Sequence, residues 1–194
     1  MDPALSWHLH ISAITKRCFG ILIGLMHIRH MVPVHILPML VDTLVISHVR
    51  YCMPVYGSTN RTGLARIQKI LNFAARVVSG RRRYDHVSDV VSELGWLRAC
   101  DMVSYFDVCL LHRILSDGKP DVLRSWLMYN HEHVCRSTRQ SHHLTLPHAR
   151  NNHGKRRFIY RTADLYNRMV IASDQSHLSM RCLKASVRQR LTGQ

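Results

Sequence analysis

The acidic side chains of this chain are few and scattered. The closest set is Asp85, Asp89 and Glu93, which recur at four-residue steps on one face of an expected helix. Such a row could hold a metal ion, but the same spacing is more typical of a solvated helix face beside basic residues. No two acidic residues are adjacent, and there is no glycine-rich phosphate loop, Gly-x-Ser-x-Gly or His-Glu-x-x-His motif. We therefore predict no catalytic residue and no metal site.

A histidine-rich segment follows residue 130. Imidazole and thiolate are the usual zinc ligands, so a zinc site is one interpretation of this segment. Its irregular spacing with a single cysteine matches no zinc finger and favours a basic, partly protonatable arm that binds nucleic acid. The residues in question are His131, His133, Cys135, His142, His143, His148 and His153.

Two short runs place an aromatic residue directly after three consecutive cations. They are Arg81, Arg82, Arg83 and Tyr84, and Lys155, Arg156, Arg157 and Phe158. Grooves that follow a nucleic-acid strand combine cations for the phosphates with rings for the bases, so both runs are candidate binding residues. An equally good interpretation is a helix end and a helix start whose aromatic residues pack into the core.

The helix expected before the first cationic run carries further candidates. Leu64, Ile67, Leu71, Ala74 and Val78 form one apolar stripe at helical spacing, and Gly80 stands where a helix-ending glycine belongs. Three cations lie off this stripe and are predicted to face a nucleic-acid strand. They are Arg66, Lys69 and Arg76.

Helical periodicity dominates the rest of the chain, and strand patterns are nearly absent, which predicts an all-α fold. Expected helices cover roughly the first 30 residues, residues 38–53, a short segment capped by Ser88, and residues 99–116, 157–170 and 176–191. We predict a thumb-like helical domain over residues 1–129, a long basic loop over 130–155, and a C-terminal helical segment over 156–194.

The net charge of the 194-residue chain is +15, from 27 Lys and Arg against 12 Asp and Glu. Residues 43–84 and 133–163 contain no acid at all. This excess indicates a polyanionic partner, which is either nucleic acid or an anionic membrane. The apolar region 21–46 is interrupted by polar residues and prolines, and Asp2 and Pro3 do not fit a secretory signal, so we expect no membrane partner and an intracellular protein, nuclear or cytoplasmic. The scattered cysteines are expected to be reduced and mostly buried.

Several segments, in their order along the chain, resemble the reverse transcriptases of jockey-type retrotransposons without long terminal repeats. The resemblance extends from about Trp7 to Leu191. Its segments are Leu44–Cys52 followed by Val55–Gly57, then Ile67–Gly80, Arg83–Val87, Glu93–Leu97, Leu146–Pro147, Gly154–Phe158 and Leu165–Asn167.

This resemblance implies the thumb and C-terminal extension, the region that follows the polymerase palm in that family. It implies contact with the RNA and DNA of a template–primer duplex, and contact with the palm of the parent polymerase. The family's Mg²⁺ ions are held by palm aspartates, including an adjacent pair that this sequence lacks, so the chain is expected to be non-catalytic and to hold no cofactor. The alternative is a helical protein–protein interaction module that exposes a surface which once faced the palm.

Overall fold

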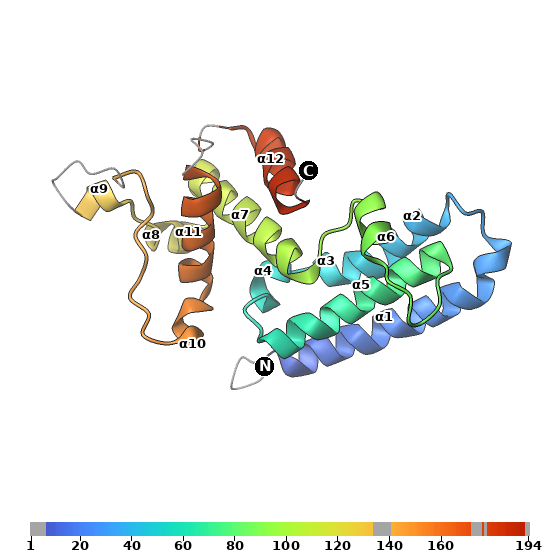
Figure 1. Cartoon of the computed structure of the whole chain (residues 1–194). Helices are drawn as coiled ribbons and strands as arrows, with labels where there is room; N and C mark the ends of the chain where they lie inside the picture. Colours follow the sequence, from blue (N-terminus) through green and yellow to red (C-terminus); the bar gives the residue numbers. More distant parts are fainter. Residues whose placement is uncertain (1–6, 134–140, 172–175, 177, 193–194) are drawn as a thin grey trace. The chain divides into compact units, whose positions relative to one another are not determined.

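The structure is a computed structural model, and it describes residues 7–133, 141–171, 176 and 178–192. Within these residues the backbone is helical and forms no strand, so the all-α prediction is confirmed. An isolated antiparallel bridge joins Tyr129 to Leu144. The chain divides into two compact units, residues 1–102 and 103–194, and Figure 1 shows the helices that make up each unit.

Unit 1 is built on two long helices, α1 (His8–Ile28) and α5 (Arg61–Ser79), which pack side by side and run in the same direction (Figure 1). The pairing of His8 with Arg66 marks one end of the contact, and the stacked rings of Phe19 and Phe73 mark its middle. Four residues of α1 are buried, Ile11, Cys18, Leu22 and Leu25. Leu9 and Ile28 share the apolar helical period of this segment but are exposed.

The segment between the two long helices begins with η1 (Arg29–Met31), which ends at the extended residue Val32. After a turn, a continuous helix with a π turn in its middle follows, made of α2 (Leu37–Val41), the π turn η2 (Asp42–Ile46) and α3 (Ser47–Arg50). Pro38 stands in the first turn, where proline costs no hydrogen bond. A short helix, α4 (Met53–Tyr56), then buries Tyr56, whose hydroxyl donates to the carbonyl of Val49.

Both ends of α5 are fixed by local interactions, and Gly80 is the C-terminal residue expected from the sequence. The Asn60 side chain caps the N-terminus by accepting from the Gly63 amide at 2.9 Å. Gly80 ends the helix with a positive φ of 74°, a conformation that favours glycine. Unit 1 continues through α6 (Ser88–Glu93) into the start of α7 (Ala99–Asp117). Val87, not Ser88, occupies the N-cap position of α6.

Unit 2 contains the rest of α7, α8 (Asp121–Ser125), α9 (Asn130–His133), α10 (Asn152–Lys155), α11 (Phe158–Met169) and α12 (Met180–Thr192). Its core joins distant segments, including Val108 and Leu111 of α7, Leu144, Tyr166 of α11 and Leu183 of α12. The predicted loop 130–155 therefore includes two short helices and a buried leucine.

Two polar side chains tie the segments of unit 2 together. The Asn167 amide pairs with both backbone groups of Leu144, accepting from its N–H at 2.8 Å and donating to its carbonyl at 2.9 Å. His112 is buried, with Nδ1 2.9 Å from the Tyr166 hydroxyl and Nε2 3.1 Å from the Leu178 carbonyl. Because a carbonyl only accepts, Nε2 donates and Nδ1 accepts from the tyrosine.

The observed units differ from the domains expected from the sequence, which placed boundaries after residues 129 and 155. The division falls instead inside α7, after Met102. Met102 is buried within unit 1, whereas Val108, Leu111 and Ile114 belong to the core of unit 2. The boundary thus runs through a single helix, α7, whose two parts belong to different units.

The segment His8–Met31 is long and apolar enough to cross a membrane, with a mean hydropathy of 1.4. Core helices of soluble proteins and signal sequences meet the same criteria. A helix over roughly the first 30 residues was expected, but a membrane partner was excluded from the region 21–46 alone, so this candidate span was not foreseen. Here one face of α1 packs on α5, while Ile23 and Met26 remain partly exposed.

Two described cysteines are buried, Cys18 and Cys109, and burial raises the pKa of the Cys18 thiol to about 11. Cys52, Cys100 and Cys182 are exposed, so the expectation that most thiols are buried is wrong for the described residues. Cys135 lies outside them.

Candidate nucleic-acid interface

The apolar face of α5 determines where its cations stand. Of the predicted stripe, Ile67, Leu71 and Ala74 are buried, whereas Leu64 and Val78 are only half-buried. Ile70, Ala75 and Val77 complete the buried face. The stripe is therefore centred slightly away from its expected position, yet Lys69 remains exposed, and Arg66 and Arg76 lie half-exposed beside the core.

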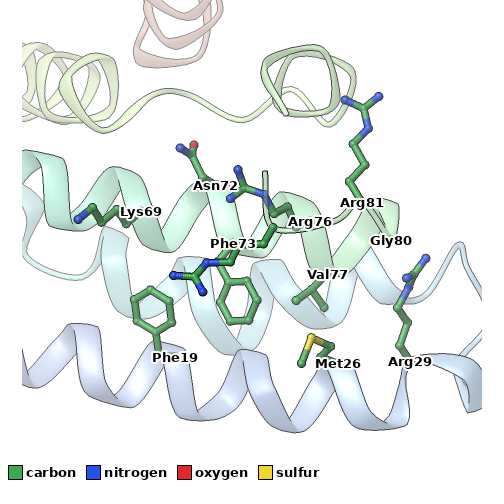
Figure 2. A pocket seen from close by; sticks show the side chains of 11 residues that line it. Phe19, Met26, Arg29, Lys69, Asn72, Phe73, Arg76, Val77, Gly80 and Arg81 are labelled. Carbon is green, nitrogen blue, oxygen red and sulfur yellow. The ribbon is translucent and has the colours of Figure 1, made fainter. Parts of the chain in front are cut away.

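A pocket of about 750 Å³ lies where α1, η1 and α5 meet the loop after Gly80. We call it the α1/α5 pocket. In Figure 2, Phe19 and Met26 rise from α1 toward Phe73 and Val77 of α5, and Arg29 points toward Gly80. Its lining consists of Phe19, Met26, Arg29, Lys69, Asn72, Phe73, Arg76, Val77, Gly80, Arg81 and Arg83.

Five of these side chains are cationic, and none of the described lining residues is acidic. Arg81 forms a two-pronged ion pair with Asp89 of α6 and also donates to the carbonyl of His86. The hydrogen bond from Arg81 lowers the pKa of Asp89 to about 2. The charge of Arg81 is thus largely offset within the molecule.

The other cations of the pocket make only neutral contacts among those observed in the described residues. Arg76 donates from one terminal nitrogen to the Asp85 carbonyl at 3.1 Å, while its buried Nε has no hydrogen-bond partner in that part of the chain. The Arg83 guanidinium lies 5.7 Å from the centre of the Tyr84 ring. The Arg29 guanidinium packs so closely on Gly80 that a Cβ added there would lie 2.0 Å from it.

The structure brings together some of the predicted binding residues and separates others. The pocket is shared by four of them, Lys69, Arg76, Arg81 and Arg83. Arg66 does not line the pocket, and its guanidinium lies 3.0 Å from the His8 ring nitrogen. Arg82 and Tyr84 are exposed outside the pocket lining, with Tyr84 at 87% exposure. Tyr84 is therefore not a core residue, contrary to the packing interpretation of this run.

The second cationic run belongs to unit 2. Lys155, Arg156 and Arg157 are exposed around the start of α11. Phe158, the first residue of α11, is half-buried and packs against the unit 2 core. For this run the packing interpretation of the aromatic residue is the better one, and only the cations remain as candidates for binding.

Sequence reasoning did not identify Phe19, Met26, Arg29, Asn72 or Phe73 as site residues. Phe73 lies between the stripe residues Leu71 and Ala74, and Phe19 directly follows Cys18, so neither residue stood out from its apolar neighbours. Arg29 sits just beyond the last turn of α1, and only the packing of α1 on α5 brings it to Gly80. Phe19 and Met26 are seven residues apart and therefore lie on the same face of a helix, and this spacing could have indicated that they belong to one site.

Among the described residues, no group of three or more His, Cys, Asp and Glu side chains is arranged to hold a metal ion. Asp89 is engaged with Arg81, and Asp85 accepts from the Arg82 amide at 2.7 Å. In the histidine-rich segment, Cys135 lies outside the described residues. His131 is stacked on Tyr129 and accompanied by His142, with ring centres 5.5 and 6.1 Å away.

Comparison with protein-family models, curated proteins and solved structures gave no match to this chain.

Proposed function

We propose that the chain is a non-catalytic, thumb-like region of a retrotransposon reverse transcriptase that contacts the backbone of a template–primer duplex. The observation that carries this proposal is the α1/α5 pocket, where Arg29, Lys69, Arg76 and Arg83 surround one hollow with no acidic lining residue among those described. Four cations held together in this way repel one another, and a polyanion relieves that repulsion.

The resemblance noted in the sequence supports the same assignment, because Ile67–Gly80 coincides with most of α5 and its capping glycine. Unit 2 carries a second group of exposed cations, Lys155, Arg156 and Arg157, which can contact phosphates in their own right. RNA and DNA are then the partners, the palm of the parent polymerase is a protein partner, and the site of action is inside the cell, in the nucleus or the cytoplasm. The polymerase Mg²⁺ ions would belong to the palm.

Salt dependence tests the nucleic-acid contact. Binding that neutralises about 5 phosphates predicts a slope of log K against log salt of roughly −4 to −5. Affinity for duplex DNA or an RNA–DNA hybrid is measured by fluorescence anisotropy over a salt series. A flat response would contradict the proposal.

A primer-extension assay with Mg²⁺ should show no synthesis by the purified chain, and template-dependent products would contradict the non-catalytic assignment.

A second candidate function is protein–protein interaction, which is favoured by apolar residues exposed near the end of α1 and in the segment between α1 and the middle of α2. These residues are Ile23, Met26, Ile28, Met31, Val34 and Met39. Clustered apolar exposure on a monomer is typical of a docking surface. Hydrophobic docking releases no counterions, so the same salt series distinguishes the two functions.

A further inference from the structure

The polar groups of the α1/α5 pocket are hydrogen-bond donors. Arginine and lysine side chains donate and cannot accept, which holds for Arg29, Lys69, Arg76 and Arg83. The buried Nε of Arg76 is a donor without a partner in the described chain. Donor groups need acceptors, so the polar side of the pocket suits a ligand that is rich in acceptor groups.

Asn72 is also oriented as a donor by its neighbours. The Ala99 amide donates to Gln68 Oε1 at 2.8 Å, so the Gln68 carbonyl end is fixed as the acceptor. Gln68 Nε2 then donates to Asn72 Oδ1, also at 2.8 Å. Because Asn72 Oδ1 is engaged, the part of the amide left for a bound molecule is the Nδ2 group, which donates.

The apolar side of the pocket is aromatic. Phe19 and Phe73 are stacked with ring centres 5.4 Å apart and ring planes 21° apart, and both rings are half-buried where they line the pocket. Met26 and Val77 continue this side (Figure 2). A ligand that fits must therefore combine a flat apolar surface with several acceptor groups, at least some of them negatively charged.

We propose that the α1/α5 pocket binds a single unpaired nucleotide of a nucleic-acid strand. The base stacks on the outer face of the stacked Phe19–Phe73 pair and accepts from Asn72, and the phosphates beside the base accept from Arg29, Arg76 and Arg83. The pocket volume of about 750 Å³ is within the roughly 300–1,000 Å³ typical of small-ligand sites. This inference rests on the proposed nucleic-acid contact and specifies which feature of the nucleic acid the contact recognises.

Selection follows from the geometry of a duplex. Within paired DNA or RNA each base is covered by its neighbours, so its face cannot reach a protein ring without unstacking. An unpaired nucleotide in an overhang, a flap or a bulge needs no base pair to be broken, so its face is exposed at a smaller cost. The pocket therefore favours a duplex that carries an unpaired nucleotide over the same duplex with blunt ends.

The test uses the full chain and three DNA duplexes of equal sequence. One carries a single unpaired 3′ nucleotide, the second carries an abasic sugar-phosphate in that place, and the third is blunt. The first two have equal charge, so a difference between them reports the base alone. Because stacking on an aromatic side chain is worth about 1–3 kcal/mol per base, the overhang with a base should bind roughly 5- to 150-fold more tightly.

Matched variants assign the preference to the pocket. Phe73→Leu should remove most of the preference for the base and leave affinity for the abasic duplex nearly unchanged. Phe106→Leu makes the same change at a half-buried ring in unit 2, outside the pocket, and should keep the preference. Phe19→Leu is a second pocket variant in case Phe73→Leu fails to fold in a thermal melt.

The arginine variants test the phosphate contacts. Arg76→Gln should weaken binding of both overhangs equally. Arg98→Gln, which changes an exposed arginine outside the pocket, should not weaken it.

The outcomes separate this inference from the function on which it rests. Salt-dependent binding with equal affinity for the base-bearing and abasic overhangs would overturn the nucleotide pocket and leave the backbone contact standing. A base preference that survives Phe73→Leu and Phe19→Leu would also overturn the pocket. No binding to any of the three duplexes would overturn both.

Discussion

At the scale of single residues, the ion pair between Asp107 and Arg161 in unit 2 is the most buried of those observed in the described residues. Arg161 donates to both carboxylate oxygens, at 2.6 and 3.0 Å, and the Asp107 side chain is fully buried. Burial raises the pKa of Asp107 to about 6, and the hydrogen bond and charge of Arg161 limit this rise. Desolvation thus outweighs the attraction of the partner.

This pKa predicts how the stability of unit 2 depends on pH. An exposed aspartate loses its proton near pH 3.9, whereas Asp107 in the fold keeps it to about pH 6. Protonated Asp107 therefore stabilises the folded state fully below about pH 4, and this stabilisation is lost as the pH rises through 6. About two pKa units correspond to a loss of about 3 kcal/mol in the free energy of unfolding.

Denaturant titrations from pH 4 to 7 measure this loss, and Asp107→Asn provides the control. Asparagine does not titrate, so the variant should lack this part of the pH dependence. Equal pH dependence in the wild type and Asp107→Asn would show that another group is responsible.

The arginines of the α1/α5 pocket should contribute unequally to binding. Arg81 is engaged with Asp89, so Arg81→Gln should leave the salt dependence of binding nearly unchanged. Arg76 has only a carbonyl partner among the observed contacts, so Arg76→Gln should weaken binding to all sequences and reduce the salt slope by about 1. Anisotropy titrations at several salt concentrations measure both slopes. A larger change for Arg81→Gln than for Arg76→Gln would contradict this ranking.

At the scale of elements, α5 shows which features could be predicted from the sequence. Its apolar period, its Asn60 cap and its terminal Gly80 are local signals, and all three act in the structure. The pocket beside it could not be predicted, because Phe19 and Arg29 reach it from a helix about 50 residues away in the chain. Periodicity identifies the buried face of a helix but not the helix that covers it.

Gly80 links the end of α5 to the pocket and carries the next prediction. Gly80→Ala places a Cβ on a residue with φ of 74° and against the Arg29 guanidinium. The backbone strain should lower the free energy of unfolding by about 1 kcal/mol. Arg29 must also move, so nucleic-acid binding should weaken as it does in Arg29→Gln.

Thermal melts and anisotropy titrations separate the two effects of Gly80→Ala. Gly118→Ala is a suitable control, because Gly118 also has a positive φ, 69°, but an added Cβ meets no neighbouring atom within 4 Å. Gly118→Ala should lower the free energy of unfolding and leave the affinity for nucleic acid unchanged. Equal affinity in Gly80→Ala and the wild type would show that the position of Arg29 does not affect binding.

At the scale of the whole chain, the two units explain why the expected domain boundaries differ from the observed ones. The sequence suggested a boundary where helical periodicity stops, near residue 130. The unit 2 core instead joins α7 to Leu144 and to α11 and α12, across that apparent gap. Asn167 makes this possible by satisfying both backbone groups of Leu144, which would otherwise be buried without partners. A contact of this kind leaves no periodic signal.

The two cationic runs belong to different units, and this leads to the last prediction. Lys155, Arg156 and Arg157 are exposed, with no acidic partner among the ion pairs observed in the described residues. If each contacts a phosphate, replacing all three by glutamine should reduce the salt slope by roughly 3, since each phosphate contributes about 0.9. The change should leave the preference for an unpaired base intact, because that preference is assigned to Phe19 and Phe73 in unit 1. Salt-dependent titrations with the base-bearing and abasic duplexes measure both quantities on the same variant. A lost base preference would show that the pocket is not the element that selects the nucleotide, and an unchanged slope would confine the nucleic-acid contact to unit 1.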